Sequence, residues 1–252
     1  MRQNVLLLCT ACLLHLPAMS ADMRAVKGDN ATAAIYVGGS IRPGDATQFA
    51  AKLRSLGISP LPVSSAPSYP RAMVVINSPG GGVRDAMEIG RAIRANQLQV
   101  VVRPDGECLS SCVYVLAAGV IRLPLGNVGI HRPYFADIPN RGVDVGLRET
   151  LAASKEYFAE MNIPASLADE MFSIPPADIR MLGDAKLSFY RLNQNDMAYE
   201  EENAIRNARA RGISRAEYGR RMKQFDERLK ACDRAPDFYR CADDLLEKLG
   251  LR

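Results

Sequence analysis

Residues 106–133 read GECLSSCVYVLAAGVIRLPLGNVGIHRP and combine a polar turn, an apolar run and a late histidine. The turn contains Ser110 and Ser111, and the apolar run after it predicts a buried helix that begins at the turn. A serine hydroxyl becomes a nucleophile when a base takes its proton and nearby N–H groups bind the oxyanion. His131 can act as that base, so the segment indicates a candidate serine hydrolase site.

A second motif lies upstream, where residues 74–83 read VVINSPGGGV. The apolar residues predict a strand, and the glycines predict a turn whose backbone can approach a ligand closely enough to donate an N–H to an oxyanion. The turn is neither a dinucleotide fingerprint nor a phosphate loop, because GxGxxG and GK[ST] are both absent. Taken singly, each motif also has a structural explanation: a tight turn, helix-capping serines and a structural histidine. Together they favour a site.

The pattern along the chain alternates strands with helices, which predicts an α/β fold with a mainly parallel sheet. The near-continuous apolar strand at residues 72–76 is typical of a sheet that is covered on both faces. Residues 22–30 and 60–70 are expected to be irregular. Further strands are expected at residues 32–37, 98–102, 120–123, 128–131 and 187–192, and helices at 45–56, 83–95, 110–118, 142–161 and 166–172.

The N-terminus resembles an export signal. Arg2 supplies a positive charge, residues 5–16 are apolar, and residues 17–21 (PAMSA) offer small side chains for cleavage after Ser20 or Ala21. A buried N-terminal helix is the alternative explanation of this segment. No later apolar run reaches the roughly 18 residues of a membrane helix, so no membrane span is expected after cleavage. The mature protein is expected to be periplasmic or secreted.

A chain of 252 residues can bury one full core with a small appendage. We therefore expect a signal peptide over residues 1–21, an α/β domain over residues 22–194 and a charged helical extension over residues 195–252. A net charge of +4 without a basic block argues against nucleic-acid binding, and the absence of Trp argues against a stacking platform.

The cysteines also favour an oxidising compartment. Without Cys9 and Cys12 the mature chain keeps an even set, which permits three disulfide pairings. The simplest pairing joins near neighbours, and two small buried thiols are the alternative at the first pair. The cysteine spacings form no zinc signature, and His131 is the only histidine after the predicted signal segment. Neither a metal nor a cofactor is therefore expected. The two expected pairs are Cys108 with Cys112 and Cys232 with Cys241.

The motifs INSPGGGVRDAMEIGRAI, CLSSCVYVLAAG and VGIHRP together resemble the Clp-protease/crotonase superfamily, and most closely exported relatives of the Clp proteolytic subunit. The resemblance covers roughly residues 33–192 and implies a crotonase-like layered β/α fold. It also implies a role for each motif: Ser110 is the nucleophile, His131 is the base, and the N–H groups of Gly81 and Ser111 form the oxyanion hole.

The family's acidic third residue is matched best by Asp178, with Asp169 and Glu170 as rivals. This chain departs from the family pattern in having Ser111 where Met is frequent, and in a shorter segment between nucleophile and histidine. These observations predict an exported, ATP-independent serine peptidase-like hydrolase that cleaves peptides or proteins and can form homo-oligomers. The alternative is a catalytically inactive Clp-like binding or scaffolding protein, and an acyl-CoA hydratase or isomerase fits poorly.

Overall fold

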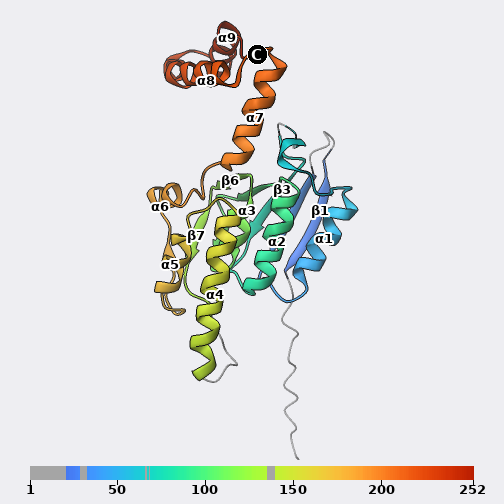
Figure 1. Ribbon diagram of the computed structural model, residues 1–252, viewed down its shortest axis with the longest axis vertical. Coiled ribbons are helices and arrows are strands. Elements are labelled where there is room, and N and C mark those ends of the chain that lie inside the picture. The colour runs from blue at the N-terminus through green and yellow to red at the C-terminus, as the bar shows by residue number, and fades with distance from the viewer. Residues whose placement is uncertain (1–20, 29–32, 66, 68, 135–139) are drawn as a thin grey trace, which may run out of the picture.

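The computed structural model describes residues 21–28, 33–65, 67, 69–134 and 140–252, so nearly all of the predicted signal segment lies outside the described residues. The chain is a mixed α/β protein, as the alternating pattern predicts (Figure 1). Its elements are β1 (Asp22–Lys27), β2 (Ala33–Gly38), α1 (Asp45–Ser55), η1 (Val63–Ser65), β3 (Ala72–Asn77), α2 (Val83–Ala95), β4 (Gln99–Val102), β5 (Glu107–Leu109), α3 (Cys112–Ala118), β6 (Ile121–Pro124), β7 (Asn127–Ile130), α4 (Asn140–Glu160), α5 (Ser166–Ser173), β8 (Arg180–Met181), α6 (Asp184–Phe189), α7 (Met197–Ala210), α8 (Arg215–Leu229), η2 (Cys232–Arg234) and α9 (Phe238–Lys248).

Within the described residues, the larger sheet has the strand order β1-β2-β3-β4-β6. Strands β2, β3, β4 and β6 are parallel to one another, and β1 is antiparallel to β2. Ile35 lies opposite Val74, and Val74 lies opposite Val100, so the central strands present their fully buried side chains in one register. Four of the predicted strands are therefore confirmed to within a residue or two. Because the strands are parallel, their carboxyl ends share one edge of the sheet.

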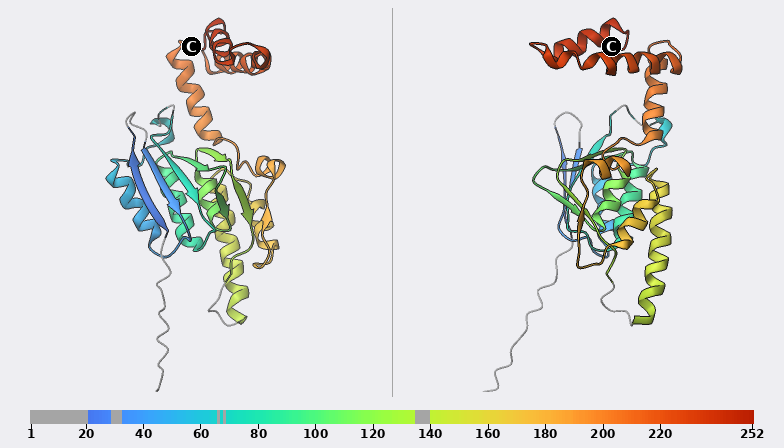
Figure 2. Two further views of the ribbon diagram at one scale, coloured as in Figure 1. Left: turned by 180° about the vertical axis from the view of Figure 1, so that it is seen from behind. Right: turned by 90° about the vertical axis from the view of Figure 1, so that its left-hand side faces the viewer.

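Helices α1, α2 and α3 lie against one face of this sheet (Figures 1 and 2). Phe49 of α1, Ile89 of α2 and Leu116 of α3 are fully buried there and form part of the main core. On the other face Val75 is buried, whereas the side chains of Met73 and Val101 are only half-buried. The expectation of a sheet covered on both faces is therefore met fully on the helical face and in part on the other, because an apolar run does not reveal which elements will pack on it.

A smaller sheet has the order β5-β7-β8, with β7 parallel to β5 and antiparallel to β8. Strand β5 was not expected, and it places the Ser110 turn at the edge where the large sheet ends. The strand expected at residues 187–192 is wrong, because helix α6 and the turn after it occupy that segment, and β8 precedes them. Residues 22–27 were expected to be irregular but form β1, since pairing with β2 orders a strand that is too polar to recognise alone.

The C-terminal segment is helical, as expected, and α8 and α9 stand away from the sheets at the end of α7 (Figure 1). A disulfide joins Cys232 to Cys241, with their Cα atoms 5.6 Å apart, which confirms the expected pairing of these two cysteines. Tyr199 of α7 donates a hydrogen bond to the Pro67 carbonyl at 3.1 Å, which ties α7 to the body. Of the described helices, none has the length and apolar character needed to cross a membrane.

A buried ionic cluster fastens α7 to the body. The Asp196 carboxylate lies 2.6 Å from Arg94 and 3.6 Å from Arg122, and it also caps α7 through the N–H of Tyr199. Burial raises the pKa of Asp196, but Arg94 and the hydrogen bond from Asn162 outweigh it, so the pKa lies below its usual value. Burial and the charge of Arg94 lower the pKa of Arg122 to about 10. The cluster is a structural joint that no sequence motif indicated.

Candidate active site

Ser110 occupies a sharp turn between the end of β5 and the start of α3. Its φ is +55°, in the left-handed region that non-glycine residues rarely adopt. The turn is held because the Ser110 N–H donates to the Gly129 carbonyl at 2.8 Å, and the Val113 N–H donates to the Ser110 carbonyl at 3.1 Å. Strained strand-to-helix turns of this kind expose the nucleophile in α/β-hydrolases. The local geometry therefore suits a nucleophilic serine.

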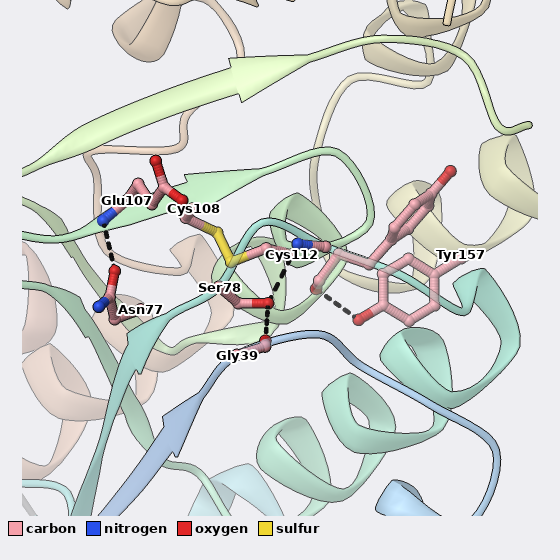
Figure 3. Close-up of a disulfide and its surroundings, with 9 residues drawn as sticks. Gly39, Asn77, Ser78, Glu107, Cys108, Cys112 and Tyr157 are labelled. Carbon is pink, nitrogen blue, oxygen red and sulfur yellow. Dashed lines mark hydrogen bonds between the residues drawn. A yellow bond between two sulfur atoms is a disulfide. The ribbon is translucent and has the colours of Figure 1, made fainter. Parts of the chain in front are cut away.

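A disulfide joins Cys108 to Cys112 (Figure 3). The two cysteines lie two residues before and two residues after Ser110, so the bridge closes this turn. Cys108 lies in β5 and Cys112 is the first residue of α3, which lets the two Cα atoms stand 5.1 Å apart. Both side chains are fully buried. The expected pairing is confirmed, and the bridge adds a covalent constraint to the strained backbone of Ser110.

The glycine turn after β3 packs directly on the Ser110 turn. Gly80 has a φ of +95°, and a Cβ on it would lie 2.7 Å from the Ser110 Cβ and 3.0 Å from the Ser111 nitrogen. Gly81 has a φ of +141°, and a Cβ there would collide with the carbonyl oxygen of Ile41. Any other residue is costly at these two positions, because they require both a positive φ and close backbone approach.

Two further contacts fix the glycine turn from the β2 side. The Ile41 N–H donates to the Gly80 carbonyl and the Gly82 N–H donates to the Ile41 carbonyl, both at 2.8 Å. The hydroxyl of the fully buried Ser78 donates to the Gly39 carbonyl at 2.7 Å and accepts from the Gly80 N–H at 3.1 Å (Figure 3). Sequence reasoning did not identify Ile41 or Ser78, because their importance depends on strand neighbours that lie far apart in the chain.

The backbone N–H groups of Gly81 and Ser111 have no hydrogen-bond acceptor among the described residues. The Ser111 N–H lies at the N-terminus of α3, where free donors and the helix dipole both favour negative charge. Because the Gly80 backbone packs on Ser111, the two donors belong to one local cluster. Free N–H groups beside a serine are what an oxyanion hole requires.

Ser110 and His131 line the same cavity, which has a volume of about 1080 Å³. Ser111 does not line it: its side chain is almost fully buried, and its hydroxyl has no partner among the described residues. The geometry therefore favours Ser110 over Ser111 as the exposed nucleophile. Val83 and Met87 of α2 also line this cavity. No sequence motif indicated that they would.

His131 follows directly after β7 and is half-buried. Its Nδ1 lies 2.9 Å from the carbonyl oxygen of Arg132. A neutral imidazole that carries its proton on Nδ1 donates to this oxygen, and its Nε2 is then the acceptor needed for a general base. His131 and Ser110 form no hydrogen bond with each other in this structure, and catalytic hydrogen bonds are often formed only once a substrate binds.

None of the acidic candidates forms a hydrogen bond or an ion pair with His131. Asp178 is exposed, and it forms no hydrogen bond or ion pair with His131. Asp169 instead pairs with Lys155 at 2.6 Å. The Glu170 carboxylate is bound by three groups, which explains why its pKa is lowered despite the opposing effect of burial. These groups are Arg180 at 3.2 Å, Lys186 at 2.7 Å and the hydroxyl of Tyr190.

No described group of three or more His, Cys, Asp and Glu side chains is arranged to hold a metal ion. The cavity is lined by Gly81, the Ser110 hydroxyl and the His131 imidazole, and also by charged side chains that include Arg84, Glu88 and Arg91. A hydroxyl, an imidazole and backbone donors suit acyl transfer. No protein-family model matches this chain, and comparison with curated proteins finds none of significant similarity. A function for the site is therefore inferred from its own residues and their geometry.

Proposed function

We propose that the chain is a serine peptidase-like hydrolase with a crotonase-like fold of the Clp-protease type. One observation carries the proposal. Ser110, held in a left-handed turn at the start of α3, opens onto a cavity that His131 also lines, beside two backbone N–H groups without acceptors. A turn that only connected β5 to α3 would not need a strained serine, a buried disulfide and free donors at the same place.

In the proposed mechanism, Ser110 Oγ attacks a peptide carbonyl and His131 Nε2 takes the hydroxyl proton. The negative charge formed on the carbonyl oxygen is bound by the N–H groups of Gly81 and Ser111. His131 then returns the proton to the leaving amine, which leaves an acyl group on Ser110. Water, deprotonated by His131, hydrolyses that acyl group and restores the site.

The substrate is proposed to be a peptide or protein in an exported compartment. Two disulfides in the described part of the chain are compatible with an oxidising environment. Hydrolysis through an acyl-enzyme consumes no nucleotide, and no nucleotide-binding motif is present in the sequence, so we propose an ATP-independent activity. Homo-oligomerisation is also part of the proposal, because the Clp-type proteases that the sequence resembles form oligomers.

A second candidate is a catalytically inactive binding or scaffolding protein on the same fold. It is favoured by the exposed position of Asp178, which forms no hydrogen bond or ion pair with His131. If the protein is a hydrolase, the carbonyl of Arg132 rather than a carboxylate orients the His131 imidazole. The site then acts as a Ser110–His131 dyad.

Turnover of a mixture of unstructured peptides distinguishes the two, with new peptide termini read by mass spectrometry. The hydrolase predicts cleavage by the natural protein and no cleavage by Ser110→Ala. Because Asp178 is exposed and unbonded to His131, Asp178→Asn is expected to retain activity within about threefold, whereas loss of a triad acid costs roughly 10⁴-fold. No cleavage by the natural protein, or equal cleavage by Ser110→Ala, would favour the scaffold.

A further inference from the structure

The first described residue, Ala21, is packed into the body of the protein. It is only 3% exposed, and its backbone nitrogen lies 3.1 Å from Oδ2 of Asp45. Asp45 is 1% exposed, and the same oxygen accepts the N–H of Arg42 at 2.8 Å. The first described residue after the expected cleavage position is therefore hydrogen-bonded to a buried carboxylate.

No ion pair between Asp45 and a basic side chain occurs in the described part of the chain. A buried carboxylate is costly unless a positive charge or several hydrogen bonds compensate it. The nitrogen of Ala21 is already in hydrogen-bonding position. It would supply the missing positive charge if it were a chain terminus, because an α-amino group is protonated at neutral pH.

The sequence places a cleavage pattern at this same bond. Ala18 and Ser20 are small residues in the spacing that export endopeptidases accept, with the bond to be cut directly after Ser20. Hydrolysis of that bond by water leaves a carboxylate on Ser20 and an α-ammonium on Ala21. Cleavage one residue later would remove Ala21 and with it the nitrogen that contacts Asp45.

We propose that the bond between Ser20 and Ala21 is the processing site of this chain, and that the new α-ammonium of Ala21 forms a buried ion pair with Asp45. This assignment rests on burial, distance and sequence, and it does not depend on the chemistry proposed for Ser110. It selects one of the two cleavage positions that the sequence alone leaves open.

The ion pair would also steady one wall of the cavity. Asp45 begins α1, and the turn before it contains Pro43 and Gly44, which line the cavity. Ile41 lies just before that turn. Its backbone is hydrogen-bonded to Gly80 and Gly82, the residues on either side of Gly81. Removal of the leader would thus fix the segment that holds the proposed oxyanion donor.

The first test is the N-terminus of the exported protein, determined by intact mass and N-terminal sequencing. The proposal predicts a chain that begins at Ala21. A chain that begins at Asp22, or that keeps its leader, would overturn the assignment of the processing site.

The second test compares the chain that begins at Ala21 with one that carries a short Gly-Ser extension before Ala21. In the first, Asp45→Asn breaks a buried ion pair and is expected to lower the Tm by roughly 6–20 °C. In the extended chain the terminal charge lies elsewhere, so the same substitution is expected to lower the Tm by about a third as much. Equal shifts in the two chains would overturn the ion pair.

Asp85→Asn is the matched control. Asp85 is also a buried carboxylate that accepts two backbone N–H groups, from Gly44 at 2.9 Å and Ala46 at 3.2 Å, but it does not contact Ala21. Asp85→Asn is expected to lower the Tm by the same amount in the chain that begins at Ala21 and in the extended chain. A shift that differs between the chains only for Asp45→Asn isolates the charge on Ala21 from the general loss of a buried carboxylate.

Discussion

Replacing Gly80 by alanine tests whether the glycine turn positions Ser110. An added Cβ would lie 2.6 Å from the Leu109 carbonyl oxygen and 2.7 Å from the Ser110 Cβ. Because carbon atoms prefer a separation of about 3.5–4.0 Å, Ser110 must move by roughly 1 Å. A misplacement of that size can reduce a reaction rate by about 100-fold.

The cost in stability can be estimated from the same geometry. Alanine at a φ of +95° costs about 1–2 kcal/mol, and the overpacking adds about 1–3 kcal/mol. A total of about 2–5 kcal/mol lies within the range of 5–15 kcal/mol that typical proteins possess, so Gly80→Ala is expected to fold with a lower Tm. Circular dichroism and disulfide content can confirm this before any kinetic assay.

The assay is the second-order rate of labelling by a fluorophosphonate, followed by intact mass. Gly82→Ala is the matched control, since Gly82 has a φ of −66° and its added Cβ would stand 3.7 Å from the nearest atom. We expect Gly80→Ala to label about 100-fold more slowly than the natural protein, and Gly82→Ala to label within about threefold of it. Labelling of a folded Gly80→Ala variant at the natural rate would refute the positioning role of the turn.

Two further predictions concern the disulfides and the buried ionic cluster. The pair Cys108→Ala and Cys112→Ala is expected to lose about 2 kcal/mol of stability and to slow labelling at least tenfold, because the Ser110 turn is no longer tied. The pair Cys232→Ala and Cys241→Ala should lose about 3 kcal/mol in the C-terminal helices and leave labelling unchanged, and equal labelling losses in both pairs would contradict this. Since the pKa of Asp196 is lowered in the folded state, its stabilisation is present above the usual carboxyl pKa and disappears as the pH falls through the folded value. Asp196→Asn is therefore expected to destabilise the protein at pH 7 by about 3–5 kcal/mol and far less at pH 2, as urea titrations can show.

The parts of the fold that could be predicted were those with a local pattern. The apolar runs of β3 and β4 and the amphipathic repeat of α2 each stand out over one short stretch. Strands β5 and β8 could not be predicted, because three and two residues form strands only through their pairing with β7. Their existence depends on tertiary contacts rather than on their own sequence.

The same distinction applies to the site. Ser110 and the glycine turn were recognisable because the chain signals a turn and a following helix at each of them. The role of Asp178 rests on counting along the chain from His131, across α4 and α5, and it stays a prediction. The contribution of Ile41 was invisible for a related reason: it acts through backbone hydrogen bonds, which any side chain would allow.

Covalent labelling of the oxidised, folded protein by a fluorophosphonate tests the central claim most directly. The measurement compares the natural protein with Ser110→Ala and Ser111→Ala, by intact mass and by mapping of the modified peptide. An activated nucleophile at Ser110 predicts a single adduct in the natural protein and in Ser111→Ala, and none in Ser110→Ala. The absence of any adduct, or an adduct that persists in Ser110→Ala, would contradict the account.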